Sequence, residues 1–407
     1  MRGNFQKEEI RSKNKLHRKV SRLDKYYLPS PFSSEDFRFY PKERDWKAIR
    51  NHVSSVLLYI TNNCNSSCRI CYQESKIGDR GGEMEKERIQ KVLDRIGKNK
   101  RVTLIGGEPT VRDDLFEIIR MVKEKGHEPE IFTNGLKLSD IKYVKKLKEA
   151  GIERVYISLD GFEEEIYEKM RGDASQLKAK LLALRNLEAM EMSTVIASVI
   201  GKDINEDQIE SLIEFGLDSI RESTDHIDGL LFYGLTDTGR CELREHETST
   251  VELLKLLKEE TNGQVVPEYL IETKKLALNI SRLMNKLNMP LNFGSGGLIG
   301  LYEPGSIEPC FPLEKIIGLN DLLERGDIFR FGLESLKTGK IRKMLGNFIS
   351  GSKIIDSISQ GNLFLGIGGV NNPSSHTSRM TGTIGLEASP NDKIMVNTTS
   401  FRDLESA

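Results

Sequence analysis

Short apolar segments alternate with longer amphipathic segments between residues 53 and 260. The apolar segments have the length of buried strands, and several end in glycine. The amphipathic segments have helical spacing; the one at 112–126 starts with acidic residues and ends with lysine and glycine, as helix termini favour. Six such strand–helix pairs predict a parallel sheet covered by helices. The expected strands lie at 53–61, 101–107, 128–135, 153–161, 193–201 and 228–235.

No two of these pairs are close repeats in sequence, which favours a barrel or a doubly wound sheet over a solenoid. We expect an α/β fold, a partial (β/α)6 TIM-like barrel, over residues 53–262. Residues 1–52, basic and then rich in proline and aromatic residues, predict an N-terminal wrap. Residues 263–407 predict a C-terminal extension that covers the substrate, with helical signal at 319–349. Within it, 366–400 is rich in Gly, Ser, Thr and Asn, which predicts a lid, a long loop or a flexible tail.

Charge and hydropathy exclude several classes of partner. The 407 residues carry a formal net charge of −1, which gives no indication of nucleic-acid binding. No apolar run approaches the ~18 residues of a membrane span, and the basic start lacks the apolar core of a secretory signal. Sparse, clustered cysteines indicate a reducing compartment, so we expect the cytoplasm. Residues 1–26 are locally basic and predict either a solvated arm or a docking surface for an acidic partner.

Three of the five cysteines lie within eight positions, as Cys64, Cys68 and Cys71. A structural zinc site would need a fourth ligand, and the sequence has no second C-x-x-C. A four-iron cluster held by three thiolates would leave one iron open for a chelating ligand. The cysteines directly follow the first expected strand, on the side of a parallel barrel or sheet where active sites lie. The position therefore favours a catalytic centre.

The C-x₃-C-x₂-C spacing after the first strand resembles the radical S-adenosylmethionine superfamily. Supporting segments follow the later strands: GGEPT at 106–110, FTNG at 132–135, SLDG at 158–161 and YEKMRG at 167–172. Together they are similar to the subgroup that contains the molybdenum-cofactor GTP cyclase, peptide-modifying maturases and archaeal lipid-coupling synthases. The resemblance covers residues 53–260.

This resemblance implies that Cys64, Cys68 and Cys71 ligate a [4Fe–4S] cluster, whose open iron is chelated by the amino and carboxylate groups of S-adenosylmethionine. It also implies that the reduced cluster breaks the C5′–S bond and that a 5′-deoxyadenosyl radical takes a substrate hydrogen. Such a protein is oxygen-sensitive and needs an electron donor such as ferredoxin or flavodoxin. The cofactor carries the chemistry, and the protein supplies orientation and exclusion of water.

The GGEP segment agrees with this role. Gly106 and Gly107 permit close approach of the backbone to a ligand, although a plain strand-to-loop turn needs the same residues. Glu108 is expected to accept a hydrogen bond from the methionyl ammonium, and Pro109 to stiffen the turn.

Polar residues at the next two strand ends extend the predicted cofactor site. Ser158 and Asp160 are expected to reach the ribose or the carboxylate end of S-adenosylmethionine. Thr133 and Asn134 lie at the same rim, but Asn-Gly is also an ordinary turn signal. Arg171 is expected to pair with the methionyl carboxylate, with a surface ion pair as the alternative.

Four further residues complete the prediction. Ser198 and Tyr233 are expected either to line the adenine site or to pack in the core. Cys310 is expected either to be a buried small hydrophobe or to donate a hydrogen atom or hold an intermediate at the barrel mouth. Cys241 and Cys310 are too few to supply the usual ligands of a second cluster.

The predicted function is therefore radical C–H functionalisation with one cluster, ending in C–C or C–S bond formation or a rearrangement. The substrate is expected to be a small molecule, a lipid or a peptide. Two alternatives stay open: a peptide maturase that holds a leader through the basic N-terminus, and a zinc-stabilised binding protein without catalysis.

Overall fold

The computed structural model describes part of the chain. The described residues are 38–39, 55–73, 75–77, 82–221, 227–237, 239–286, 298–301, 312–327, 330–331, 364–367, 384–388 and 395–398.

The six expected strands are confirmed and form a continuous parallel sheet in the order β2-β5-β6-β7-β8-β9. Their bounds are β2 Ser55–Thr61, β5 Arg101–Gly106, β6 Glu128–Thr133, β7 Arg154–Ser158, β8 Thr194–Ile200 and β9 Ile227–Gly234. Among the described strands the sheet stays open, because its two edges do not pair with each other. This arrangement confirms the predicted partial barrel.

Short strands from the chain's two ends extend the sheet. On one side, β12 (Ile384–Ala388) pairs parallel with β2, followed by antiparallel β13 (Met395–Thr398) and β1 (Arg38–Phe39). On the other, β11 (Phe364–Ile367) pairs parallel with β9, and β10 (Leu298–Leu301) is antiparallel to β11. Residues 384–388 and 395–398 were expected to be loop or tail, because their periodicity is weak. They form strands by pairing with residues more than 300 positions away, which a local pattern does not reveal.

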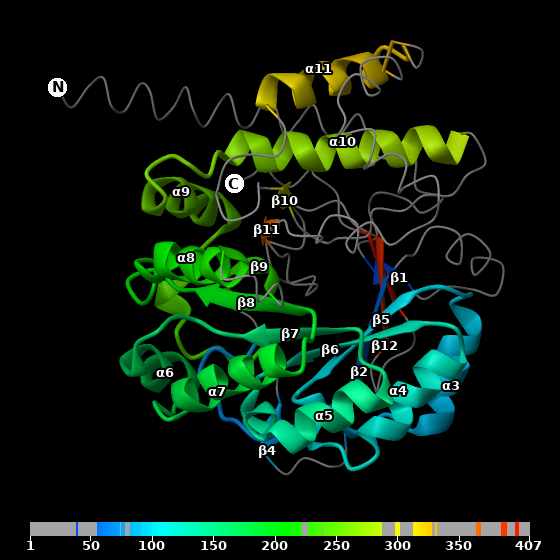
Figure 1. Ribbon diagram of the computed structural model, residues 1–407, viewed down its shortest axis with the longest axis vertical. Helices are drawn as coiled ribbons and strands as arrows, with labels where there is room; N and C mark the ends of the chain where they lie inside the picture. Colours follow the sequence, from blue (N-terminus) through cyan, green and yellow to red (C-terminus); the bar gives the residue numbers. More distant parts are fainter. Residues whose placement is uncertain are drawn as a thin grey trace.

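A helix follows each of the six strands, as predicted, and the short helix at 164–171 was not expected (Figure 1). They are α3 Lys86–Arg95, α4 Leu115–Glu124, α5 Ile141–Ala150, α6 Glu164–Arg171, α7 Gln176–Ala189, α8 Gln208–Arg221 and α9 Thr250–Glu260. Local sequence sets several of their ends. In α9, Ser249 and Glu252 form a reciprocal capping box. In α5, the Asp140 side chain accepts from the Lys142 N–H, and Gly151 ends the helix with left-handed geometry.

Two helices lie beyond the barrel pattern. Helix α10 (Pro267–Lys286) was not expected, although Pro267 occupies a favourable first position and apolar side chains such as Tyr269 and Leu276 are buried. Helix α11 (Leu313–Glu324) lies beside α10, and both lie above β10 in the view of Figure 1. None of the described helices has the length and apolar composition to cross a membrane.

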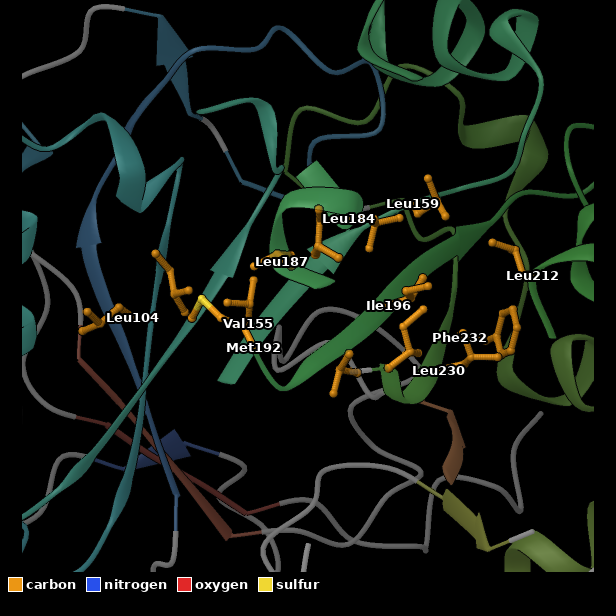
Figure 2. Close-up of a cluster of buried hydrophobic side chains, with 14 of the residues drawn as sticks. Leu104, Val155, Leu159, Leu184, Leu187, Met192, Ile196, Leu212, Leu230 and Phe232 are labelled. Carbon is orange, nitrogen blue, oxygen red and sulfur yellow. The ribbon is translucent and has the colours of Figure 1, made fainter. Parts of the chain in front are cut away.

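The main core lies between the sheet and its helices. Alternate strand side chains point toward the helices and are fully buried, because side chains in a strand alternate between its two faces. Figure 2 shows the strand residue Val155 near the helix residue Leu187 and the strand residue Phe232 near the helix residue Leu212, all within one buried cluster. Each buried leucine contributes about 1.5–3 kcal/mol by leaving water.

The other face of the sheet, which these helices do not cover, carries aromatic and polar side chains. Phe132 and Tyr156 are partly exposed there and stack with ring centroids 5.7 Å apart and an interplanar angle of 2°. Deeper in the sheet, Glu130 pairs with Arg154 at 3.5 Å and accepts a hydrogen bond from Thr103 at 3.0 Å. This face therefore combines aromatic rings with buried charges.

A matched pair of leucines tests the packing. Leu104→Ala removes a fully buried side chain and is expected to lower the free energy of unfolding by about 2–5 kcal/mol. Leu182→Ala, at a side chain that is 44% exposed, is expected to change it by less than about 0.5 kcal/mol. Denaturant unfolding of both variants measures the difference; similar losses would contradict the position of the core.

Candidate active site

The cysteine loop begins at the end of β2 and is anchored from two distant parts of the chain. The N–H groups of Arg69 and Ile70 donate to the carbonyl of Met170 in α6, at 2.9 and 3.3 Å. The N–H of Arg240, after β9, donates to the carbonyl of Cys71 at 2.9 Å. The loop is therefore held between the ends of α6 and β9, at the carboxyl edge of the parallel sheet.

Gly106 and Gly107 allow β5 to end directly against this loop. A side chain at Gly106 would place its Cβ 2.2 Å from the carbonyl oxygen of Thr61, and Gly106 also has φ +152°. A Cβ at Gly107 would lie 2.4 Å from the carbonyl oxygen of Asn63. The close approach that these glycines permit in the structure is to the protein's own backbone, and their contact with a cofactor stays a prediction.

The Glu108 carboxylate joins the ends of β5 and β6. It is 1% exposed, and its Oε1 accepts from the Thr110 N–H, the Thr110 hydroxyl and the Thr133 hydroxyl, at 3.1, 2.7 and 2.7 Å. Oε2 accepts from the Asn134 N–H at 2.6 Å. Thr133 and Asn134 therefore position Glu108, and Pro109 opens the short helical turn that follows it.

Lys180 joins the ends of β6 and β7 from helix α7. Its ammonium group is fully buried and donates to the Asn134 carbonyl, the Ser158 carbonyl and the Ser158 hydroxyl, at 2.7, 2.9 and 2.8 Å. Burial and the nearby Arg171 lower the pKa of Lys180 to about 8. The three acceptors use all three ammonium hydrogens. The Asn134 side-chain amide also donates to Asn65, at 2.8 Å, and so connects this rim to the cysteine loop.

Asp160 and Arg171 form a buried bidentate ion pair. Arg171 Nε and Nη2 donate to the two carboxylate oxygens at 2.7 and 2.8 Å. Burial alone would raise the pKa of Asp160, but Arg171 and Lys180 hold it below its usual value. The Val199 N–H on β8 also donates to Asp160, at 3.0 Å. The expected contact of Arg171 with a methionyl carboxylate stays a prediction, and here its main partner is Asp160.

The three cysteines differ in their electrostatic surroundings. Burial raises the pKa of Cys64 to about 12, and the nearby Glu108 carboxylate adds to the shift. Burial acts in the same direction on Cys68, but Arg171, a hydrogen bond with Ser66, and Lys180 together lower its pKa. Arg171 Nη1 lies 3.8 Å from Cys68 Sγ. The thiolate, which is the form that binds metal, therefore forms more easily at Cys68 than at Cys64.

The donor set provides the three thiol groups that the resemblance implies for an iron–sulfur cluster. All three cysteines are free, partly exposed and on one loop. Within the described residues, no three His, Cys, Asp or Glu side chains converge where one metal ion could be held. A tetrahedral zinc site requires such convergence. In a four-iron cluster each thiolate binds a different iron, so the sulfur atoms need to surround a cluster rather than meet at a point.

The remaining predicted residues have separate positions. Ser198 is buried and donates to the Leu159 carbonyl at 2.5 Å, which matches the packing alternative. Tyr233 lies on β9, and burial raises its pKa. Cys241 is 3% exposed and belongs to the core. Cys310 lies outside the described residues.

Sequence reasoning missed three polar residues of the site: Lys180, Gln176 and Ser66. Lys180 and Gln176 lie on the buried face of α7, where the sequence analysis recorded only a helix. The available signal was Lys180 itself, a charged residue at a helix position where the spacing predicts an apolar one. Ser66 carries no signal that separates it from Ser67 beside it.

Residues 58–216 match the family described as the Radical SAM superfamily. These residues form a radical SAM domain. The expected resemblance is confirmed.

Two relatives illustrate the range of similar proteins. The chain is 30% identical over 318 residues to the 7,8-dihydro-6-hydroxymethylpterin dimethyltransferase of Methanocaldococcus jannaschii, covering 73% of this chain and 60% of that one. It is 34% identical over 165 residues to a probable GTP 3',8-cyclase of Pyrococcus horikoshii, covering 40% and 52%. The chain thus spans about half to three fifths of the length of these relatives. Both relatives are named as enzymes.

Among solved structures, Streptococcus suis SuiB bound to S-adenosylmethionine aligns with a TM-score of 0.43 and 18% identity. That alignment covers 54% of this chain and 50% of SuiB.

Lys180 provides a test of the rim. Lys180→Met keeps the length of the side chain but leaves three buried oxygen atoms without their donor, and is expected to cost about 1.5–3 kcal/mol of unfolding free energy. Lys178→Met, on the exposed side of the same helix, is the matched control, with an expected change below about 0.5 kcal/mol. Urea unfolding measures both, and equal values would show that Lys180 does not hold the strand ends.

Proposed function

We propose that the protein is a radical SAM enzyme that binds a single [4Fe–4S] cluster through Cys64, Cys68 and Cys71. The observation that carries the proposal is the cysteine loop itself, placed at the strand ends of a radical SAM domain beside Glu108 and Arg171. When bound, the cluster and S-adenosylmethionine supply reductive cleavage of S-adenosylmethionine and removal of a hydrogen atom from the substrate.

The protein's own residues orient these groups. Glu108 is the proposed acceptor for the methionyl ammonium, because Oε2 accepts one hydrogen bond from the described residues whereas Oε1 accepts three. Ser158 and Asp160 stay proposed contacts of S-adenosylmethionine, held in place by Lys180 and Arg171. The buried ion pair and the buried ammonium limit the water that reaches this rim.

A single cluster agrees with the position of Cys241. Its side chain is packed in the core with Leu243 as a neighbour in sequence, and burial raises its pKa. Such a thiol is a poor ligand for a second cluster. Cys310 alone cannot supply one.

For the substrate we propose a small molecule that reacts on the face of the sheet that the helices do not cover. The proposed outcome is C–C or C–S bond formation or a rearrangement. Two relatives are named for a dihydropterin and for GTP, which supports a small molecule over a lipid or a peptide. The stacked pair Phe132 and Tyr156 offers that face an aromatic surface. The maturase alternative depends on residues 1–26, outside the described residues. We place the reaction in the cytoplasm, with ferredoxin or flavodoxin as electron donor.

Iron content tests the cluster. The protein purified and reconstituted without oxygen is expected to hold about four irons per chain and equal sulfide. Alanine at Cys64, Cys68 or Cys71 is expected to abolish bound iron and 5′-deoxyadenosine formation, because each thiolate holds its own iron. Cys241→Ala is the control that keeps both. Zinc in place of iron, or full iron content in the triple variant, would exclude the proposal.

Affinity for S-adenosylmethionine tests Glu108. Glu108→Gln is expected to weaken binding at least about tenfold, because a hydrogen bond to a charged group contributes about 1.5–3 kcal/mol. Titration calorimetry on cluster-loaded protein measures the change. Glu117→Gln, which alters an exposed ion pair with Lys86, is the control and is expected to bind normally. An unaltered affinity in Glu108→Gln would remove Glu108 from the cofactor site.

A further inference from the structure

Two hydrogen bonds link helix α7 to one of the three cysteine sulfurs. The side-chain amide of Gln176 donates from Nε2 to Ser66 Oγ at 3.0 Å, and Ser66 Oγ lies 3.1 Å from Cys68 Sγ. Gln176 and Ser66 are 5% and 6% exposed. This Gln176–Ser66–Cys68 relay brings together residues 110 positions apart, between a helix N-terminus and the cysteine loop.

The direction of the relay follows from the chemistry of its members. A serine hydroxyl has one proton to donate, and an amide nitrogen can only donate. Because Ser66 accepts from Gln176, its own proton is available to Cys68. A metal-bound thiolate can only accept, so the two hydrogen bonds match the ligand form of the cysteine.

The amide orientation of Gln176 decides whether Ser66 can donate to the sulfur, and it leaves one polar atom unpaired. Gln176 Oε1 is buried and has no hydrogen-bond partner among the described residues. If the amide were turned over, Ser66 would donate to Oε1 and would no longer donate to the sulfur. The orientation that leaves Oε1 unpaired is therefore the one that delivers a proton to Cys68.

Cys68 also has a second donor. Arg171 Nη1 lies 3.8 Å from its sulfur, and the ion pair with Asp160 fixes the guanidinium. In the described part of the chain, both side-chain donors found at a cysteine sulfur converge on Cys68. The three cysteines thus differ in the side-chain donors that lie beside their sulfur atoms.

We propose that Ser66, oriented by Gln176, is a positioning residue that raises the reduction potential of the cluster through its hydrogen bond to Cys68. This inference rests on the proposed function. One-electron reduction by an external donor adds negative charge that spreads onto the thiolate sulfurs. A hydrogen-bond donor stabilises the more negative form, and hydrogen bonds to the sulfurs are among the factors that set cluster potentials.

Potentiometry of the cluster-loaded, full-length protein tests the relay. Ser66→Ala is expected to shift the midpoint potential of the cluster to more negative values and to leave the iron content unaltered. The electron paramagnetic resonance signal of the reduced cluster measures the extent of reduction at each potential. Ser67→Ala is the matched control, because Ser67 is the adjacent serine on the same loop but is exposed. Its potential is expected to equal that of the unmodified protein.

Gln176→Glu tests the orientation separately and leaves Ser66 in place. A carboxylate of the same shape accepts the Ser66 proton and is expected to lower the potential. Because it also adds charge, the same substitution is made in the Ser66→Ala protein, where only the charge effect remains. A smaller shift in that background is expected if Ser66 transmits part of the effect.

The outcomes separate the two proposals. Unaltered potentials in Ser66→Ala, in a protein that holds iron and cleaves S-adenosylmethionine, would overturn this inference and leave the proposed function intact. Equal Gln176→Glu shifts in both backgrounds would overturn the orienting role of Gln176. Absence of iron from the unmodified protein would overturn both proposals.

Discussion

The buried ion pair between Asp160 and Arg171 is the interaction on which the rest of the site depends. It connects the segment after β7, where Asp160 lies, to the end of α6, and each partner makes a further contact. Asp160 accepts from the Val199 N–H on β8, and Arg171 reaches Cys68. Loss of one partner would leave a buried, unpaired charge, which costs about 3–5 kcal/mol. The position of the cysteine loop is therefore coupled to the register of the sheet.

Electrostatic balance explains why so many charges are buried here. Two carboxylates, Glu108 and Asp160, lie with two cations, Arg171 and Lys180, so the formal charges cancel before any ligand is bound. The carboxylates are not equivalent. Asp160 pairs with a guanidinium, whereas the groups that donate to Glu108 among the described residues are neutral hydroxyl and backbone N–H groups. The site thus offers one negative group at the rim and positive charge beside Cys68.

Much of this fold was predictable, and the failures have physical causes. The six strands and their helices were predicted from the spacing of apolar residues and from glycines near their ends. Cys64, Glu108 and Ser158 were singled out because they lie at or just after the ends of predicted strands. The edge strand β12 was missed because its pairing with β2 depends on residues far apart in sequence. Lys180 was missed because helical spacing records that a position is buried, not that a buried ammonium meets three strand-end acceptors there. Pairing between distant residues is invisible in a local pattern.

Helix α7 shows how one element coordinates the site. Gln176 and Lys180 are four residues apart, and therefore lie on the same face of the helix. The first donates into the cysteine loop, and the second donates to the ends of β6 and β7. Because a helix is stiff over one turn, the cysteine loop and the strand ends hold a fixed spacing. Helix α7 thus holds Cys68 and Ser158 in one geometry without a ligand, and such preorganisation would lower the entropy lost when the proposed cofactor binds.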